Sequence, residues 1–328
     1  MTSEVEERIH RVLKSHPPER TDDGYRLVHP GGAGISTLRF APPDEHRDGP
    51  QAAAVAEVVA DFGVSDFPSF HPTGVQRLNA MAVFGAYHLN GPRLRQTARY
   101  TIYSSDPDPH LATQTILHAF GGQLPLGRSV AIGTTSPAAL EQQRAHHNLP
   151  RQWPAPFPQE EMQNAAAVIQ GQGLPASNHA TAVWSELALS GDCPSRNIDP
   201  AAETAVLQVS VDTPHPVAGA GYLAAITLPP VEKQVNPAAI CARLNALEWD
   251  EVGFAPRHGA WGLHGPEDVI GYRCFMPAGV PYEGLQTSLL LFMALRAAWI
   301  RDRYWRVKQG ITLESLANPK PQSRLTRD

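Results

Sequence analysis

Residues 258–277 read HGAWGLHGPEDVIGYRCFMP, and a similar phrase, FGAYHLNGPRLRQTARYTIYSSDP, occupies residues 84–107. Ten positions are identical when residues 84–120 are aligned without a gap to residues 258–294; composition alone predicts about two. The tetrapeptide RLNA precedes both phrases, at residues 77–80 and 243–246. This internal similarity predicts a chain built from two tandem repeats.

Each repeat predicts the same order of elements. A helix carries RLNA, two strands joined by a Gly-Pro turn follow, and a helix closes the unit. Asn236 and Pro237 are expected as the cap and first turn of the second RLNA helix. Further helices are predicted at residues 4–13 and 159–169, and further strands at residues 24–29, 35–42, 182–189, 206–211 and 221–229. The predicted fold class is α+β: two tandem pseudo-symmetric repeats, each an antiparallel sheet with helices packed on one face.

Proline placement predicts the boundaries of the repeats. Residues 149–158 contain four prolines, which prevent regular structure and indicate a linker. We therefore expect a first repeat at residues 1–149, a Pro-rich linker at 150–158 and a second repeat at 159–308. Residues 309–328 are polar, contain Pro319 and Pro321, and are predicted to form a mobile tail.

Composition narrows the class of protein. A net charge of -5 and a pI of about 6.3 give no overall attraction to phosphates, which argues against a nucleic-acid partner. The three cysteines form no CxxC pair, so neither a zinc site nor a disulfide framework is indicated. The apolar run at residues 285–300 is too short for a membrane span and contains Arg296. Arginine outnumbers lysine by 23 to 4, a bias that a GC-rich bacterial genome would impose. A bacterial, cytoplasmic protein without a membrane span is expected.

The hairpin of each repeat predicts two distinct strand faces. Pairing Trp261 with Tyr272 places a mostly apolar set on the core face: Trp261, Leu263, Ile270, Tyr272 and Cys274, with Tyr87, Leu89, Ala98, Tyr100 and Ile102 in the first copy. The opposite face is smaller and more polar. It carries Gly262, Gly271, Arg273 and Phe275, so another chain could approach its backbone closely.

The order of elements, with GAWGL, GPED and YRCFMP leading into the apolar helix LLLFMALRAAW, resembles the type III secretion chaperone-like and YbjN-like superfamily of bacterial domains, including the tandem TY-Chap versions. The resemblance covers residues 231–304 well and residues 75–122 less well. It implies a small α+β module that binds protein segments, with no catalytic residues and no cofactor. It also implies that the tandem repeat is a dimer fused into one chain, either a monomeric pseudo-dimer or a homodimer.

Partner binding is therefore predicted on the small-residue face. The predicted partner-binding residues are Arg273, Phe275, Val269, Gly262, His264, Arg99 and Tyr103. Arg99 and Arg273 are singled out because the gapless alignment places them at corresponding positions; a structural salt bridge repeated in both copies is the alternative. Basic residues of the last helix, Arg296, Arg301, Arg303 and Arg306, suggest either a solvated face or a contact with an acidic partner.

Other patterns favour ordinary structural roles. Adjacent His146 and His147 point in different directions on a helix and are poor joint metal ligands, so no metal site is predicted. The glycine stretches at residues 31–36 and 219–224 precede strands and lack the GK[ST] ending of a phosphate loop. Cys193 and Arg196 lie close in sequence, but no histidine base is indicated, so a loop cysteine is favoured over a nucleophile.

The sequence is compatible with three functions. The favoured hypothesis is a non-enzymatic chaperone or adaptor that holds a segment of another bacterial protein on an open sheet face or at the junction of the repeats. The second is an enzyme with a cleft between the repeats, assembled from residues such as His88, His264, Asp192 and Cys193. The third is a structural oligomerisation subunit.

Overall fold

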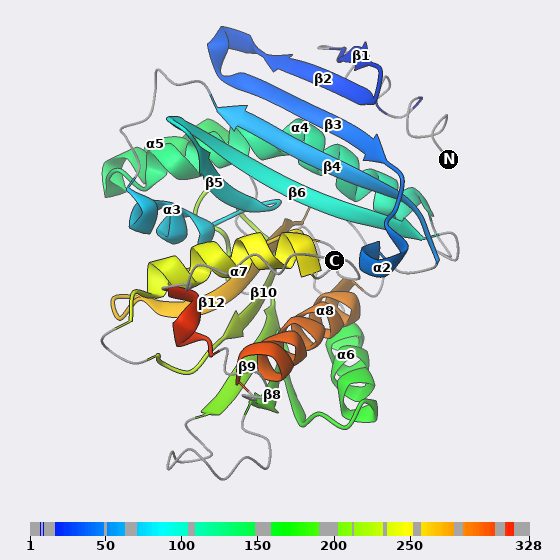
Figure 1. Ribbon diagram of the computed structural model, residues 1–328, viewed down its shortest axis with the longest axis vertical. Helices are drawn as coiled ribbons and strands as arrows, with labels where there is room; N and C mark the ends of the chain where they lie inside the picture. Colours follow the sequence, from blue (N-terminus) through cyan, green and yellow to red (C-terminus); the bar gives the residue numbers. More distant parts are fainter. Residues whose placement is uncertain are drawn as a thin grey trace, which may run out of the picture.

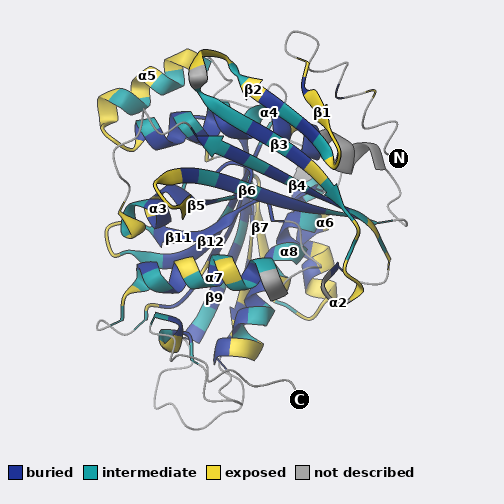
Figure 2. Ribbon diagram, turned by 45° about the horizontal axis from the view of Figure 1, so that its top comes forward, coloured by how far each residue is buried: buried dark blue, intermediate teal, exposed yellow. Residues whose placement is uncertain are grey.

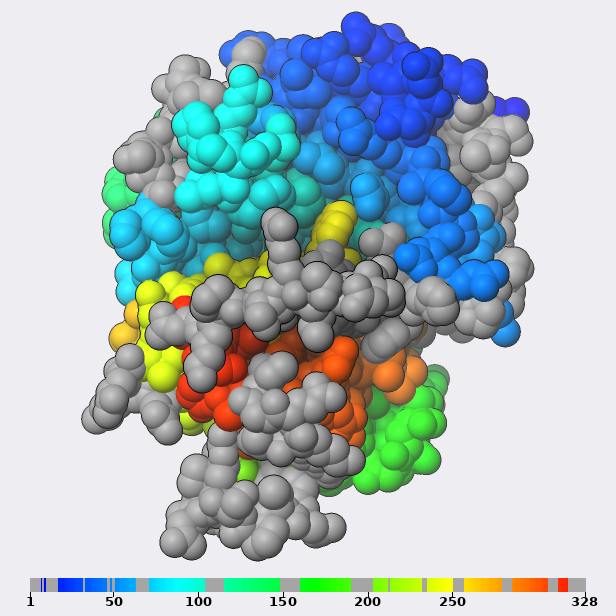
Figure 3. All heavy atoms as spheres, in the orientation of Figure 1, coloured from blue at the N-terminus to red at the C-terminus, as the bar shows by residue number. Residues whose placement is uncertain are grey.

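Two antiparallel sheets, one from each half of the chain, organise the protein (Figure 1). They are seen in a computed structural model, and Figure 3 shows the halves stacked as two lobes. The structure describes residues 7, 9, 17–48, 51–62, 71–103, 109–147, 159–189, 203–211, 213–231, 235–251, 257–278, 285–305 and 312–317.

The first sheet has six strands in the order β1-β2-β3-β4-β6-β5, and every neighbouring pair is antiparallel. β4, absent from our sequence prediction, is a central strand that pairs with both β3 and β6. The strands are β1 (Glu19–Thr21), β2 (Gly24–His29), β3 (Gly34–Ala41), β4 (Ala52–Phe62), β5 (Ala86–Asn90) and β6 (Arg93–Tyr103).

The second sheet repeats this topology. Its order is β11-β12-β10-β9-β8-β7, which is the first sheet's order position by position when read from β7. The α+β class and the two sheet-and-helix repeats are therefore confirmed. The strands are β7 (Ala176–His179), β8 (Ala182–Ala188), β9 (Thr204–Ser210), β10 (Gly221–Thr227), β11 (Ala260–His264) and β12 (Val269–Pro277).

Helices pack on each sheet and between the two sheets. α4 lies against β3, β4 and β6, whereas α6 and α8 cover the second sheet (Figure 1). α3 and α7, which carry the RLNA segments, lie side by side between the halves. The α-helices are α2 (Glu45–Asp48), α3 (Pro72–Asn79), α4 (Pro109–Gly133), α5 (Pro137–His147), α6 (Gln159–Gly171), α7 (Pro237–Glu251) and α8 (Leu285–Ile300). The 3-10 helices span Pro30–Gly32 and Glu314–Ala317, and a π-helix spans Arg301–Trp305.

The predicted core faces of the hairpins are buried, with one exception. Trp261 pairs with Tyr272 as expected, and Tyr87 donates from its hydroxyl to the Gly127 carbonyl of α4 at 3.0 Å. Leu89 was expected in the core as well, but it lies near the end of β5 and is 38% exposed. In Figure 2 the inner strands are buried while α5 and β1 are largely exposed.

The two hairpins differ in loop length, which corrects the gapless alignment. Asn90 pairs with Arg93 across a two-residue turn, whereas His264 pairs with Val269 across a four-residue loop. Gly91, with φ of 60°, supplies the positive φ that the short turn requires.

This difference shifts β6 by two residues relative to β12. Ala86 pairs with Thr97, and the equivalent Ala260 pairs with Arg273. Thr97 is thus the counterpart of Arg273, and the predicted correspondence between Arg99 and Arg273 is wrong.

The asparagine of each RLNA segment binds the backbone of an edge strand. In the first half, Asn79 accepts from Tyr87 N at 2.6 Å and donates to Tyr87 O at 3.1 Å. In the second half, Asn245 accepts from Trp261 N at 2.8 Å and donates to Trp261 O at 2.9 Å. Both strands lie at sheet edges, where outward-facing N–H and C=O groups lack a neighbouring strand. Each asparagine therefore satisfies backbone groups that the sheet leaves open.

The halves meet closely at Gly262 of β11. A Cβ atom at this position would lie 2.6 Å from both Ala80 N and Gln76 O of the α3 segment. Only glycine lets the helix backbone approach this near, so the small residue predicted to admit another chain admits α3 of the same chain.

Backbone hydrogen bonds also join the halves. Gly85 N donates to His258 O at 2.7 Å, and Arg257 N donates to Arg99 O at 2.9 Å. Buried apolar residues from both sheets belong to one continuous core cluster. The predicted open faces of the two hairpins are consequently turned toward the other half.

Several expected segments fall outside the described residues or differ from expectation. The linker at 150–158 and nearly all of the helix at 4–13 lie outside them. Within the segment predicted as a mobile tail, Leu313 and Leu316 are buried and the 3-10 helix Glu314–Ala317 packs against α7. That part is packed because its leucines cover apolar surface. Across the described part of the chain, no helix has the length and hydrophobicity needed to cross a membrane.

Gly262→Ala tests the close contact between α3 and β11. The added methyl group must displace helix backbone, so we expect the free energy of unfolding to fall by about 2 to 3 kcal/mol. Gly171→Ala is the matched control, since a Cβ there meets nothing within 4 Å, and we expect it to be neutral or slightly stabilising. Urea unfolding measures both; equal effects would contradict the contact.

Candidate functional site

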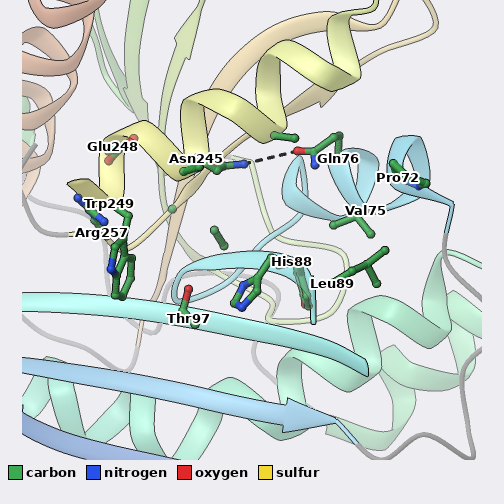
Figure 4. Close-up of a pocket in the computed structure, with 15 residues that line it drawn as sticks. Pro72, Val75, Gln76, His88, Leu89, Thr97, Asn245, Glu248, Trp249 and Arg257 are labelled. Atoms are coloured by element: carbon green, nitrogen blue, oxygen red, sulfur yellow. Dashed lines mark hydrogen bonds between the residues drawn. The ribbon is translucent and has the colours of Figure 1, made fainter. Parts of the chain in front are cut away.

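A pocket of 610 Å³ lies at the junction of the two halves (Figure 4). This volume is within the range of small-molecule and side-chain binding sites. α3, β5, β6, α7 and the segment before β11 all contribute to its wall. The lining residues are Pro72, Val75, Gln76, Ala86, Tyr87, His88, Leu89, Thr97, Ala242, Asn245, Ala246, Glu248, Trp249, Arg257 and Gly259.

The pocket exists where the two halves depart from symmetry. Tyr87 and Trp261 are held by equivalent asparagines, so His88 of β5 occupies the position that Gly262 occupies in β11. At Gly262 the α3 backbone closes onto the strand. His88 has an imidazole side chain where Gly262 has none. Here the space between β5 and α7 is open and forms the pocket.

Three polar residues of the wall are already engaged within the protein. Gln76 accepts from Asn79 at 3.2 Å and from Asn245 at 3.5 Å through Oε1, which links the two RLNA helices. Glu248 accepts from Trp261 Nε1 at 2.8 Å and from Arg296 Nε at 2.7 Å. Gln76 Oε1 and both Glu248 oxygens are therefore already engaged, and these groups hold the frame of the pocket.

Arg257 differs from these residues. Arg257 is 5% exposed, and its Nε, Nη1 and Nη2 have no hydrogen-bond partner among the described residues. Its guanidinium lies 4.8 Å from the centre of the Trp249 ring. Burial lowers its pKa to about 9, with the Glu248 charge acting in the opposite direction. Figure 4 shows Arg257 and Trp249 together at one end of the pocket.

His88 and Thr97 place further polar atoms in the wall, opposite α7. Burial lowers the pKa of His88, a bond with the Ala86 backbone opposes this, and Arg95 lowers it further. The imidazole is therefore largely neutral at pH 7 and offers a hydrogen bond without a charge. Val75, Leu89 and Ala246 make much of the remaining wall apolar.

Two of the sequence-predicted partner-binding residues are buried where the halves meet. Gly262 contacts α3, and Phe275 is 2% exposed with its ring 4.9 Å from that of His215. Arg99 is buried as well, and its Nη2 lies 2.7 Å from Asp48 Oδ1. This ion pair is the structural role that the sequence left as an alternative for Arg99, although it is not repeated at Arg273.

The other predicted partner-binding residues are half-buried and none lines the pocket. They are His264, Val269, Arg273 and Tyr103. His264 lies over Gly271, whose missing Cβ leaves room for the imidazole; a Cβ there would be 2.7 Å from His264 Cδ2. Their role in partner binding stays a prediction, and the structure does not gather them with the pocket.

The remaining motifs are dispersed in the fold. Of the residues suggested for an enzymatic cleft, His88 lines the pocket, His264 lies on the hairpin, and Asp192 and Cys193 are outside the described residues, as is Arg196. His146 and His147 lie on α5 with ring centres 5.2 Å apart. The glycine stretches lead into β3 and β10 as predicted.

Arg296 corrects the predicted basic face of the last helix. Its side chain is 1% exposed, pairs with Glu248 and lies 4.3 Å from the Tyr272 ring centre. Arg306 is outside the described residues. An isolated arginine within the apolar run of 285–300 was the available signal for a buried partner.

Comparisons with protein-family models, with curated proteins and with solved structures found no match.

His215 forms a second polar contact between the halves. Its Nε2 lies 2.9 Å from Met81 O, while Nδ1 accepts from Val217 N at 3.1 Å and Ala218 N at 2.9 Å. This arrangement requires a neutral ring that donates through Nε2, since a protonated Nδ1 would face two donors. Burial lowers the pKa to about 4, partly opposed by the Met81 bond.

Acidification should therefore weaken the junction. The folded pKa of His215 lies below its unfolded value, so the unfolded chain binds more protons as pH falls from about 7 toward 4. We expect His215 to contribute a loss on the order of 2 kcal/mol between pH 7.5 and 5. Urea unfolding at both pH values should show a smaller loss in His215→Phe than in the native chain, and an equal loss would refute this role.

Proposed function

We propose that the chain is a non-enzymatic binding module, a chaperone or adaptor, that holds an apolar segment of a partner protein in the pocket between its two halves. The observation that carries this proposal is the asymmetric junction, closed by α3 at Gly262 and open at His88. A preformed concave site with an apolar wall and few polar groups suits the capture of a side chain.

The arrangement of the edge strands supports this site over strand addition beside the hairpins. Asn79 and Asn245 occupy the backbone groups of Tyr87 and Trp261, so a partner strand would have to displace an asparagine at either edge. The pocket needs no such displacement.

The proposal agrees with the resemblance to the tandem TY-Chap domains, in which a fused pseudo-dimer would bind protein segments. Enzymatic activity is less well supported. The described lining residues include no cysteine or serine that could act as a nucleophile beside His88, and both oxygens of the Glu248 carboxylate already accept hydrogen bonds, from Trp261 and Arg296.

Site-specific photo-crosslinking tests the proposal. A photoreactive amino acid at Leu89, 38% exposed at the pocket, should crosslink a discrete protein in a lysate of the source organism. The same group at Val28, 51% exposed and outside the pocket, is the control. In the chain that carries the photoreactive group at position 89, Ala246→Asp should abolish capture by introducing a charge into the apolar wall, and Val28→Asp should leave capture unchanged.

Excess unlabelled chain should compete with the Leu89 crosslink. If positions 89 and 28 capture the same proteins, or if position 89 captures none, the pocket does not hold a protein segment.

A further inference from the structure

Arg257 is a buried cation whose side chain lacks hydrogen-bond acceptors. A guanidinium removed from water loses much of its hydration energy unless acceptors replace the water. Within the described part of the chain, no atom accepts from its Nε, Nη1 or Nη2. The Trp249 ring, 4.8 Å away, supplies a cation–π contact but accepts none of these hydrogen bonds in the plane of the group.

Two other buried arginines of the junction region are each paired with a carboxylate. Arg99 lies 2.7 Å from Asp48, and Arg296 lies 2.7 Å from Glu248. Both carboxylates are themselves buried. Arg257 is also buried, but no carboxylate of the described residues pairs with it.

Glu248, the acidic residue that lines the same pocket, does not accept a hydrogen bond from Arg257. Its Oε1 accepts from Arg296 and its Oε2 accepts from Trp261. Moving Glu248 to Arg257 would take the carboxylate away from the buried Arg296, which is equally unfavourable. None of the described residues supplies the missing acceptor, whereas a ligand in the pocket could.

We infer that the pocket binds an apolar group carrying one carboxylate, with the carboxylate on Arg257. This inference rests on the proposed function, because it names the chemistry of the occupant of the same pocket. The planar guanidinium can donate two parallel hydrogen bonds to a carboxylate. Val75, Leu89 and Trp249 provide the apolar surface for the rest of the ligand.

A single negative charge fits better than two. Arg257 is the single arginine or lysine among the described lining residues, His88 is largely neutral, and the Glu248 carboxylate lies in the same wall. A phosphate dianion would bring its second charge toward Glu248. On a protein partner, the matching group is the free carboxyl terminus of an apolar residue; a small organic acid has the same chemistry.

Calorimetric titration of the full chain tests this assignment with three kinds of probe. The first is a set of N-acetyl dipeptides that end in valine, leucine or phenylalanine with a free carboxylate. The second is the same set as C-terminal amides, and the third is 4-phenylbutyrate. We expect the peptide acids to bind at least about tenfold more tightly than the amides, since charge-assisted hydrogen bonds are lost in the amide.

Arg257→Met should remove the difference between acid and amide, and Arg257→Lys should retain part of it. Arg77→Met is the control, because Arg77 lies at the junction, 62% exposed and paired with Asp268, but outside the pocket. Without ligand, Arg257→Met should melt at the same or a higher temperature than the native chain, because it removes an uncompensated buried charge. The peptide acid should raise the melting temperature of the native chain only.

If the amides bind as tightly as the acids, the carboxylate assignment is wrong and the proposed function stands, since the pocket still takes the segment. If no probe binds at millimolar concentration, or if Arg257→Met binds the acids normally, the assignment is also overturned. If 4-phenylbutyrate binds as tightly as the peptides, the carboxylate site is supported and a small organic acid is its source.

Discussion

The paired hydrogen bonds of Asn79 and Asn245 to the edge strands are the constraint on which the junction depends. Each bond pair fixes an RLNA helix beside the outer strand of its own sheet. With both helices held there, the halves meet through α3, α7 and the hairpin faces beside them, and Arg144 of α5 adds a hydrogen bond to Pro216 O at 2.8 Å. Gln76 then links the two asparagines, and Gly262 permits α3 to pack on β11. The asparagine bonds to the edge strand, here called the asparagine clamp, are thus the same in both repeats, whereas the residues around them differ.

The sequence difference between His88 and the equivalent Gly262 accompanies the pocket at the junction of the halves. His88 of β5 stands where β11 has Gly262, and Arg257 lines the open pocket with no acceptor for its guanidinium among the described residues. Residues that oppose the stability of the free protein are commonly retained where a ligand compensates for them. The proposed binding role follows from this local departure, not from the repeated elements.

The repeated elements and the buried faces of the hairpins could be predicted from the sequence, because the alternation of apolar residues along a strand follows which side chains are buried. Trp261 and Tyr272 are examples, and Asn236 caps α7 as expected, accepting from Ala238 N at 3.0 Å. The sequence could not give the two-residue difference between the hairpin loops, since an ungapped identity of two arginines suggested equal length. β4 was missed because its alanine-rich sequence has weak strand propensity. The pocket was not predictable, because the partners of Arg99 and Arg296 and the absence of one for Arg257 depend on packing between distant segments.

The central claim is that the two halves form one cooperative unit around a shared junction. Hydrogen-exchange mass spectrometry along a urea titration measures this directly, by following amides of β4 in the first sheet and β9 in the second. We expect both strands to lose protection at the same urea concentration, because one core cluster and the clamped helices join them. Loss of protection in one strand while the other stays protected, over a clear range of urea, would contradict the claim.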